Sequence, residues 1–500
     1  MRIIVSMITL SLVLSIIPSG MGEEASDLYE KELGKYLELQ DKIERAHIGQ
    51  KAREYIKEKL KIAKAILDSI KDEGDSLAYF ERLARVDGLL GTLESYLYLE
   101  EKNATAEEVL NLLNSLKEEA YRLINETRPR REFGSSLLYY QGVVYYRMGE
   151  QGEENRLIKD AIASYNMAIS YVTISKYVKT GRSAGISKDV AELAVELGIR
   201  EVALMTLEKE PMSPYYSLYV YSARRALEEG YYDVAFYLMA YITTLVDEYY
   251  DIEEEPKPVK RSSNPMVEFN VDSHRIMEEI ASKLDGISKK DAEEKARIHS
   301  ILAWKLSEIF GDARSEDTEE KKIAVYGEFK GHKYAKWRLD GARQVDLHAI
   351  RDLGIKQSVS DVEWLTSPEG NVTVYSVGGP NVNGLTRELV QYLGLFGKKS
   401  LFIGDNRIEG LNKGIFYVYF RGARKYYGAR KYYVVAGVGG SGTRAAALGK
   451  TSGMPILTPR GVIYIYELEG DTDLDGERDP GEDWEVKGED WEVKEVYPWA

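Results

Sequence analysis

The stretch that decides the fold class of the C-terminal part reads VTVYSVGGPNVN over residues 372–383, and a similar stretch reads YVVAGVGGSG over residues 433–442. Each is a run of β-branched and aromatic residues that ends in a Gly-Gly loop and precedes Thr-Arg, at Thr386-Arg387 and at Thr443-Arg444. Such runs favour strands, glycine permits a sharp reversal of the chain, and threonine is a good helix N-cap. The pattern predicts two strand–loop–helix units and hence a mixed α/β domain over residues 322–500.

Residues 23–250 have the pattern of an almost uninterrupted series of helices. Apolar residues recur at spacings of three and four with Glu and Lys between them, and proline is nearly absent before Pro129. This periodicity is typical of amphipathic helices. Small residues alternate with tyrosine over 136–171 and 217–246, which resembles the helix hairpins of tetratricopeptide (TPR) repeats. We therefore predict a TPR-like helical hairpin domain over residues 23–250.

Proline and charge separate the helical part from the rest. Residues 251–268 carry Pro256, Pro258 and Pro265 among charged runs, which disfavours a helix interior and predicts a linker. Apolar residues at helical spacing return before a charged break at 313–321, so residues 269–321 are predicted to be a helical connector. Beyond it, strand-like runs at 323–326, 372–377, 400–403, 415–420, 432–436 and 462–466 alternate with helical segments at 385–395 and 443–448. The predicted fold class is multidomain, α followed by α/β.

The first 22 residues have the pattern of a secretory signal peptide. Arg2 precedes a mostly apolar stretch over 3–17, and Pro18, Gly20 and Gly22 precede two glutamates. The apolar stretch is short for a membrane span of about 20 residues, and no later run is long enough to cross a bilayer. We expect cleavage after Gly22 and a secreted, cell-surface protein, and the alternative is an uncleaved anchor.

Composition excludes several classes of function. The 500 residues carry 82 Asp and Glu against 67 Lys and Arg, a net charge of −15, which disfavours nucleic acid as a partner. The chain has no cysteine, so disulfide scaffolds, thiolate metal sites and cysteine nucleophiles are excluded. Abundant Glu, Lys, Arg and Tyr with little Gln follow the trend of thermophilic proteins.

The second glycine loop also fits the dinucleotide-binding fingerprint, with Gly437, Gly439 and Gly442 between a predicted strand and a predicted helix. The helix that follows is short, however, and Glu467 lies about 25 residues beyond the last glycine rather than about 20. Nicotinamide cofactors are also scarce outside the cell. A Walker phosphate loop would need a lysine directly before Thr443, where the chain has glycine. These features argue against a nucleotide cofactor.

Together the two segments resemble the paired strand–loop–helix elements of archaeal S-layer proteins and related cell-surface proteins. The resemblance covers roughly residues 322–470 and rests on the loop at 377–383 and the segment at 434–447. It implies an archaeal cell-envelope location, with other envelope proteins, an S-layer glycoprotein or glycans as partners. The long helical N-terminal part departs from the S-layer pattern, which favours an accessory envelope protein over the main lattice subunit.

The strongest chemical signal is the acidic stretch DTDLDGERDPGE over residues 471–482, which matches the spacing of a calcium-binding loop at every fixed position. Calcium takes six to eight oxygen ligands, and five carboxylates this close would repel one another without a cation. The predicted ligands are Asp471, Asp473, Asp475, the backbone carbonyl of Glu477, Asp479 through water, and bidentate Glu482. We predict one structural calcium site, and the alternative is a solvated acidic turn.

Two further features bear on the surface and partners of the protein. Asn103, Asn125 and Asn371 each begin an Asn-x-Thr sequon, so glycosylation is expected if the chain is exported. The tyrosines dense over 215–241 predict packing, with an aromatic groove for peptide or glycan as the alternative.

Two short tandem duplications lie near the C-terminus, GARKYY over 422–433 and GEDWEVK over 481–494. The first gathers four cations, at Arg424, Lys425, Arg430 and Lys431, and is interpreted as a solvated hairpin, with binding of acidic glycans as the alternative.

The sequence contains no recognisable catalytic motif, and its five histidines are scattered. We therefore predict an exported, calcium-stabilised cell-envelope protein with a structural or binding function and assign no catalytic residue. The alternative is an exported hydrolase acting on glycan or peptide, with the helical domain as a platform for the substrate.

Overall fold

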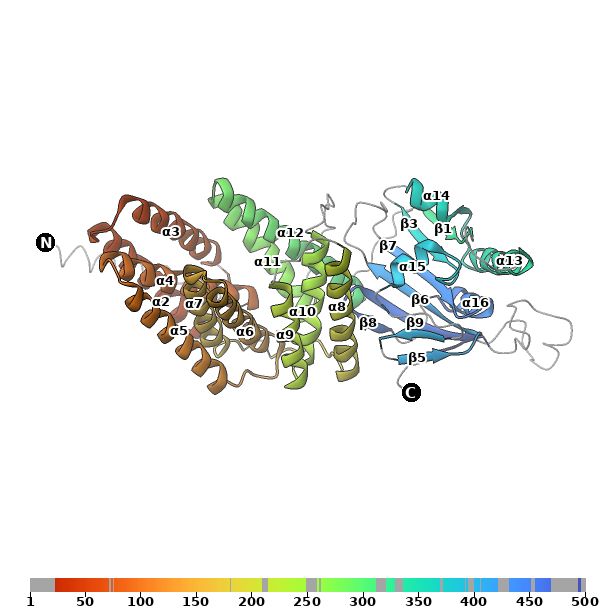
Figure 1. Cartoon of the computed structure of the whole chain (residues 1–500), viewed down its shortest axis with the longest axis horizontal. Helices are drawn as coiled ribbons and strands as arrows, with labels where there is room; N and C mark the ends of the chain where they lie inside the picture. The colour runs from red at the N-terminus through yellow and green to blue at the C-terminus, as the bar shows by residue number, and fades with distance from the viewer. Residues whose placement is uncertain are drawn as a thin grey trace. The chain divides into compact units, whose positions relative to one another are not determined.

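The computed structural model describes the chain in two compact units that interleave along the sequence (Figure 1). The first unit contains residues up to Ile186 together with Pro214–Ala235 and Pro258–Ala303, and the second contains Ser187–Ser213, Phe236–Lys257 and Trp304–Ala500. The described residues are 23–71, 73–74, 76–179, 181–208, 215–248, 259, 262–311, 321–328, 336–368, 372–391, 393, 400–404, 406–420, 431–450, 455–468 and 493–495.

The first unit is built from helices. Its helices are α2 (Glu23–Arg45), α3 (Gln50–Ile70), α4 (Leu77–Glu101), α5 (Ala106–Glu126), α6 (Phe133–Glu154), α7 (Ile158–Ser175), α9 (Tyr215–Glu228), α11 (Pro265–Lys283) and the greater part of α12 (Gly286–Ile309). Local sequence sets several of their ends. Ser76 caps α4, and Thr105 with Glu108 forms a capping box at the start of α5.

Glycines bring α6 and α7 together as an antiparallel pair. A Cβ added at Gly149 would lie 2.5 Å from the ring of Tyr165, and one at Gly152 would lie 3.1 Å from the backbone of Ala161. Tyr165 is fully buried, so the missing side chains of α6 make room for its ring. The hairpin expected over 136–171 is therefore present, and its small residues serve close helix packing.

The predicted linker at 251–268 ends earlier than the sequence pattern indicated. α11 begins at Pro265, because Asn264 caps the helix through a 2.9 Å bond to the amide of Met266 and proline is well suited to the first helical position. Pro265, one of the three prolines that suggested a linker, therefore starts a helix. Most of the remaining linker lies outside the described residues, so its role as a domain boundary stays a prediction.

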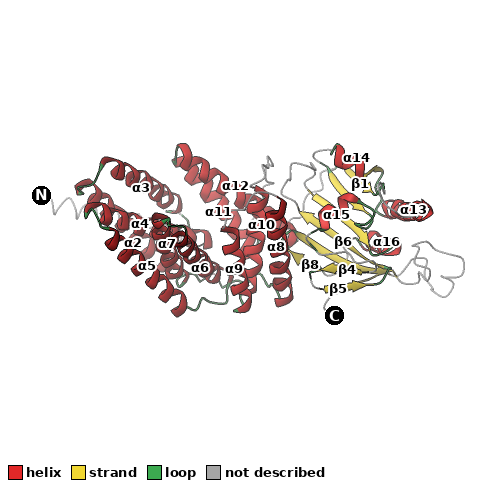
Figure 2. Cartoon of the chain, viewed as in Figure 1, coloured by secondary structure: helices red, strands yellow, loops and turns green. Residues whose placement is uncertain are grey.

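All strands that the structure describes belong to the second unit (Figure 2). They are β1 (Lys322–Tyr326), β2 (Gln357–Ser360), β3 (Thr373–Val377), β4 (Ser400–Ile403), β5 (Asn406–Glu409), β6 (Lys413–Phe420), β7 (Lys431–Gly437), β8 (Ile456–Thr458), β9 (Gly461–Leu468) and β10 (Val493–Glu495). The helices of this unit are α8 (Lys188–Glu208), most of α10 (Tyr232–Glu248), α13 (Lys336–Asp352), α14 (Asp361–Thr366), α15 (Gly384–Val390) and α16 (Gly440–Gly449). The predicted strand runs are confirmed at 323–326, 372–377, 400–403, 415–420, 432–436 and 462–466.

The main sheet is mixed, with the order β10-β9-β6-β7-β3-β1-β2 and β8 paired to β9. Strands β2, β1, β3 and β7 are parallel, whereas β6, β9 and β10 add antiparallel neighbours beyond β7. The coarse prediction of a helical part followed by a mixed α/β part is therefore confirmed. Because β3 and β7 are parallel neighbours, both glycine loops leave the sheet at the same edge.

Helices cover both faces of this sheet. One face carries Ile323, Val374 and Val434, which form a core with Trp364 of α14, Leu385 of α15 and Leu193 of α8. On the opposite face, α16 lies against β9, where Gly449 meets the ring of Tyr466, and α13 packs against α16. No helix among the described residues is long and apolar enough to cross a membrane.

Candidate functional site

The predicted calcium ligands lie outside the described residues. Asp471, Asp473, Asp475, Glu477, Asp479 and Glu482 all fall between Leu468 and Val493, where the description of the chain stops and resumes. Among the described residues, no group of three or more histidine, aspartate or glutamate side chains could hold a metal ion. The calcium site therefore stays a prediction. The cationic residues Arg424, Lys425 and Arg430 are likewise undescribed, and Lys431 begins β7.

The glycines of the fingerprint loop are explained by close backbone packing. A Cβ at Gly442 would overlap the carbonyl oxygen of Lys413, and one at Gly414 would overlap the carbonyl oxygen of Gly442. At Gly439, the added atom would lie 2.7 Å from the carbonyl oxygen of Leu411. The strand β6 and its preceding turn thus lie directly against the start of α16, at a distance that only glycine permits.

The amides at the start of α16 are also engaged by the chain itself. The amide of Gly442 donates to the carbonyl of Leu411 at 3.2 Å, the hydroxyl of Ser441 donates to the same carbonyl at 3.1 Å, and the amide of Val438 donates to Lys413 at 3.0 Å. A dinucleotide-binding loop would turn such groups toward a pyrophosphate. Here they hold the turn before β6, so this loop is a packing motif.

Side chains close the first glycine loop in a different way. Asn383, which is fully buried, donates to the carbonyls of Val325 in β1 and Val377 in β3 at 2.9 and 2.8 Å, and its own oxygen caps α15 at the amide of Thr386. Asp361 accepts from the amides of Glu328 and Gly384 at 2.8 and 2.7 Å. The point between β1 and β3, where doubly wound sheets commonly bind ligands, is therefore filled by the protein's own polar groups.

Asp346 of α13 is a buried acid beside this loop. A Cβ added at Gly378, whose φ is +108°, would lie 2.5 Å from the Asp346 carboxyl group, and the Oδ2 atom has no hydrogen-bond partner among the described residues. Burial raises the pKa of Asp346 well above its ordinary value. The carboxyl group therefore favours its protonated, neutral form, and glycine is needed at 378 both for its φ and for the space.

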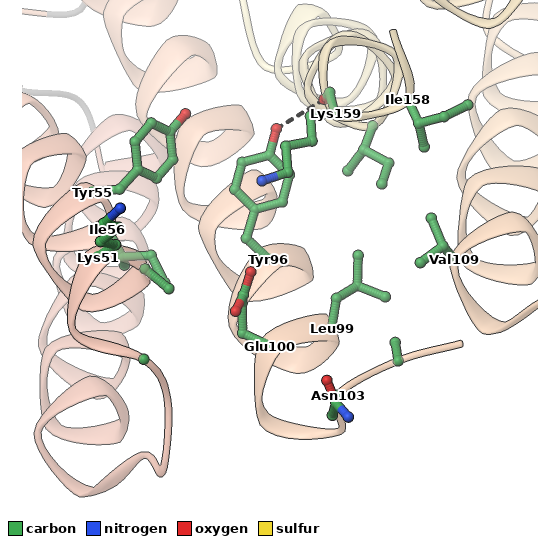
Figure 3. A pocket seen from close by; sticks show the side chains of 14 residues that line it. Lys51, Tyr55, Ile56, Tyr96, Leu99, Glu100, Asn103, Val109, Ile158 and Lys159 are labelled. Atoms are coloured by element: carbon green, nitrogen blue, oxygen red, sulfur yellow. Dashed lines mark hydrogen bonds between the residues drawn. The ribbon is translucent and has the colours of Figure 1, made fainter. Parts of the chain in front are cut away.

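A pocket lies in the helical unit, between the ends of α3, α4, α5 and α7 (Figure 3). Its volume is about 720 Å³. The lining residues are Gly49, Lys51, Ala52, Tyr55, Ile56, Tyr96, Leu99, Glu100, Asn103, Ala104, Val109, Ile158, Lys159 and Ile162. Leu99, Val109 and Ile158 reach the space from three different helices, so the pocket is a product of the fold and has no local sequence pattern.

Two tyrosines form one wall of the pocket. The rings of Tyr55 and Tyr96 lie 6.2 Å apart at 44°, and the Tyr96 hydroxyl donates to the backbone carbonyl of Lys159 at 2.8 Å, which ties α4 to α7 (Figure 3). Burial, followed by the nearby Tyr55 and Asp160, raises the pKa of Tyr96, so its hydroxyl stays protonated and remains a donor. Tyr55 is 45% exposed and offers its ring to solvent.

The polar groups of the pocket have both signs of charge. Lys51, Glu100 and Asn103 are exposed at its mouth, whereas Ile56 and Ile162 are buried at its base. Asn103 is also the sequon asparagine, and its φ of 48° is the left-handed conformation that asparagine tolerates. The arrangement suits a ligand with an apolar body and polar edges.

Sequence reasoning had placed a possible aromatic groove at the tyrosines of 215–241. Those that the structure describes mainly pack. Tyr231 lies edge-on to Tyr140 at 5.5 Å and donates to the carbonyl of Pro129 at 3.0 Å, and Tyr237 is buried. The pocket tyrosines were missed because single residues at 55 and 96 stand out in no window of the sequence.

No protein-family model, curated protein or solved structure matches this chain.

Proposed function

We propose that this protein is an exported, cell-envelope binding protein that holds a short peptide segment of a partner in the pocket between α3, α4, α5 and α7. The pocket is the observation that carries the proposal. Its volume of about 720 Å³ lies within the usual range of about 300–1,000 Å³ for ligand sites, and it joins an apolar base to a few polar groups.

The aliphatic base favours a peptide over a glycan. Ile56, Leu99 and Ile162 offer no hydrogen bonds, so the hydroxyl groups of a sugar would lose their water there without compensation. A peptide can place one apolar side chain at the base while its backbone polar groups meet Lys51 and Glu100 at the mouth. The Tyr55 ring adds an exposed aromatic surface beside the entrance.

The helical unit is proposed to be TPR-like, as its sequence pattern suggested. The antiparallel α6–α7 pair supports this idea, because small residues of one helix receive aromatic rings of the other. Stacked helix pairs create extended binding surfaces, which agrees with a peptide ligand.

A location at the envelope is proposed from the leader pattern over 1–22 and from the resemblance of the C-terminal part to S-layer proteins. The partner would then be another envelope protein or an S-layer glycoprotein. Cell fractionation followed by N-terminal analysis of the exported form tests this part, because the mature chain is expected to begin at Glu23.

A peptide-display library screened against the purified chain tests the binding function. We expect enrichment of peptides that share one apolar residue, with affinity measured by fluorescence anisotropy. Ile158→Glu should weaken that binding at least tenfold, because a charge would enter the pocket at the first residue of α7, where the helix itself tolerates an acid.

Leu157→Glu is the matched control, since Leu157 is 52% exposed and does not line the pocket. Equal loss in both variants, or selective binding of glycans on a carbohydrate array, would contradict the peptide proposal. Turnover of a peptide or glycan would support the hydrolase alternative.

Calcium is proposed to stabilise the C-terminal unit through residues 471–482. Extracellular calcium modules have Kd values of about 10⁻⁴–10⁻³ M, so 1 mM calcium should add about 0.4–1.4 kcal/mol. Calorimetry should show a small rise in melting temperature that disappears in Glu482→Ala and persists in Thr472→Ala, which changes a position that supplies no ligand. An unchanged response in Glu482→Ala would identify the loop as an acidic turn.

A further inference from the structure

Four basic side chains of the helical unit, on two helices, are close enough for their charges to act on one another. Arg82 and Arg85 are three residues apart on α4, and Lys295 and His299 are four residues apart on α12, so each pair shares one helix face. The charges of both arginines act on both Lys295 and His299, which places the four groups in one cluster. We call this group the basic cluster. It is distinct from the pocket, which α4 meets through Tyr96, Leu99 and Glu100 at its other end.

The hydrogen bonds of the basic cluster are incomplete. Arg82 is 1% exposed, and one of its terminal nitrogens, Nη1, lies 2.5 Å from Glu81, yet its Nε and Nη2 atoms have no hydrogen-bond partner among the described residues. Arg85 is half-buried; burial lowers its pKa, but the charges of Tyr145, Tyr171, Glu81 and Asp291 more than offset this, so its pKa is raised. Buried guanidinium groups ordinarily find acceptors, so two donors of Arg82 lack a partner among the described residues.

The nearby carboxylates are already engaged. Glu81 accepts from the hydroxyl of Tyr171 at 2.5 Å in addition to its contact with Arg82, and Asp291 accepts from Lys295 at 2.6 Å. Three permanent or titratable cations therefore share two carboxylates. Arg85 lies near Tyr145 and Tyr171, whose rings are 5.1 Å apart, and it shares the negative charge of Glu81 and Asp291 with Arg82 and Lys295.

The pKa values of Lys295 and His299 indicate an excess of positive charge around these two side chains. Burial, then Arg85 and Arg82, lowers the pKa of Lys295 to about 8, although Asp291 acts in the opposite direction. Burial, Arg82 and His274 together lower the pKa of His299 well below its ordinary value. The Nδ1 atom of His299 lies 2.8 Å from the Asn270 oxygen, whose amide nitrogen donates to Met266, so His299 is a neutral ring with its proton on Nδ1.

We propose that the basic cluster binds an oxyanion, with the unpartnered nitrogens of Arg82 as its principal donors and Arg85 and the ammonium of Lys295 as further cationic ligands. An oxyanion with two or more acceptor oxygens matches the fork of a guanidinium group, which binds carboxylate and phosphate in a bidentate manner. Such a ligand would supply the acceptors that Arg82 lacks among the described residues. The chemistry is shared by a phosphate group and by the carboxylate of an acidic sugar.

Isothermal titration of the full chain with inorganic phosphate and with glucuronate, at constant ionic strength and with chloride as the reference anion, tests this site. We expect saturable binding of at least one of the two at millimolar concentration, and the tighter one identifies the source. Arg85→Gln should reduce that affinity at least tenfold, whereas Arg122→Gln, which removes an exposed arginine of α5, should leave it unchanged.

Melting temperature with and without ligand separates binding from a structural role. Oxyanion should raise the melting temperature of the wild type and leave that of Arg85→Gln unchanged, because a ligand that binds only the folded wild type stabilises it by mass action. NMR of the Lys295 side chain should also show its pKa rising from about 8 when the anion binds, since the added negative charge favours the ammonium form. Absence of saturable binding, or equal binding by wild type and Arg85→Gln, would overturn the proposal. Lys295→Gln serves as a second variant should Arg85→Gln not fold.

Discussion

The two glycine loops of the α/β unit look alike in sequence and are closed by different physical means. After β3, the loop is held by side chains: Asn383 joins β1 to β3, and Asp361 holds the amides of Glu328 and Gly384. After β7, the loop is held by backbone, because Gly442 and Gly414 let α16 and β6 approach closely. The same strand, Gly-Gly, Thr-Arg and helix order thus serves two kinds of closure.

This difference teaches what a glycine motif can and cannot indicate. In the second loop, three glycines at fingerprint spacing satisfy a requirement for space between two segments of the same chain, and the amides that a nucleotide would use are bonded to Leu411 and Lys413. In the first loop, Gly378 satisfies a requirement for positive φ beside a buried acid. The proposed ligand site is therefore in the helical unit, where the pocket of about 720 Å³ lies.

The comparison predicts the largest loss of stability at the backbone-closed loop. Gly442→Ala should destabilise the second unit by about 3 kcal/mol or prevent its folding, because the new methyl group meets the Lys413 carbonyl, which cannot rotate away. Hydrogen–deuterium exchange of peptides over 406–420 and 431–450 measures the effect. Gly34→Ala, in an open position of α2, is the matched control and should stabilise its helix by up to about 1 kcal/mol. A Gly442→Ala protein with normal protection would break the comparison.

At the side-chain-closed loop, the key residue is Asn383. Asn383→Ala should cost about 2–3 kcal/mol, because two buried carbonyls lose their donor and α15 loses its cap. Asn383→Asp retains the cap oxygen while losing both donors, so it should still be destabilising, and the difference between the two variants in chemical denaturation reports the cap. A loss below about 0.5 kcal/mol in both variants would show that side chains do not close this loop.

Asp346 provides a pH-dependent test of the same loop. Because its pKa in the folded chain is raised, its contribution to stability is full below the unfolded pKa near 3.8 and is lost as the pH rises through the folded value. Asp346→Asn removes this titration, so it should raise the melting temperature at pH 8 and have little effect at pH 4. Thermal unfolding of wild type and variant across that range measures it, and equal shifts at both pH values would mean that Asp346 is ionised in the fold.

The smallest expected effect is at the hydroxyl pair behind the first loop. Ser376 of β3 and Thr386 of α15 share one hydrogen bond of 2.8 Å, and both are buried. Thr386→Val keeps the shape and removes one partner, which should cost about 1 kcal/mol in denaturant titrations. Ser376→Ala combined with Thr386→Val removes both hydroxyls, and recovery of part of the loss would show that the unpaired hydroxyl is the source of the cost.

The sequence predicted those elements whose signal is local. β1, β3, β6, β7 and β9 were found because their residues are strongly apolar and β-branched or aromatic. β2 was missed because Gln357–Ser360 is polar, and α13 was missed because its charged sequence shows little apolar periodicity. The order of strand, Gly-Gly loop and helix could be predicted from the sequence, yet the segment that fills the space beside Gly442 could not.

The candidate sites were beyond sequence reasoning for a related reason. The pocket joins residues between 49 and 162 from four helices, and the basic cluster joins Arg85 to Lys295 across more than two hundred residues. Asp346 is one acid among 82 and carries no distinguishing neighbours. Only the acidic loop at 471–482 has a purely local signal, and it remains a prediction.

The polar strand β2 has a consequence for how this protein meets other copies of itself. It pairs with β1 on one side and has no second strand neighbour among the described residues, it has only four residues, and Ser360 at its end already caps α14. Short polar edges are poor templates for the strand of another molecule. Intermolecular sheet growth is therefore discouraged at this edge, so a second copy that approached β2 would have to be held through side chains.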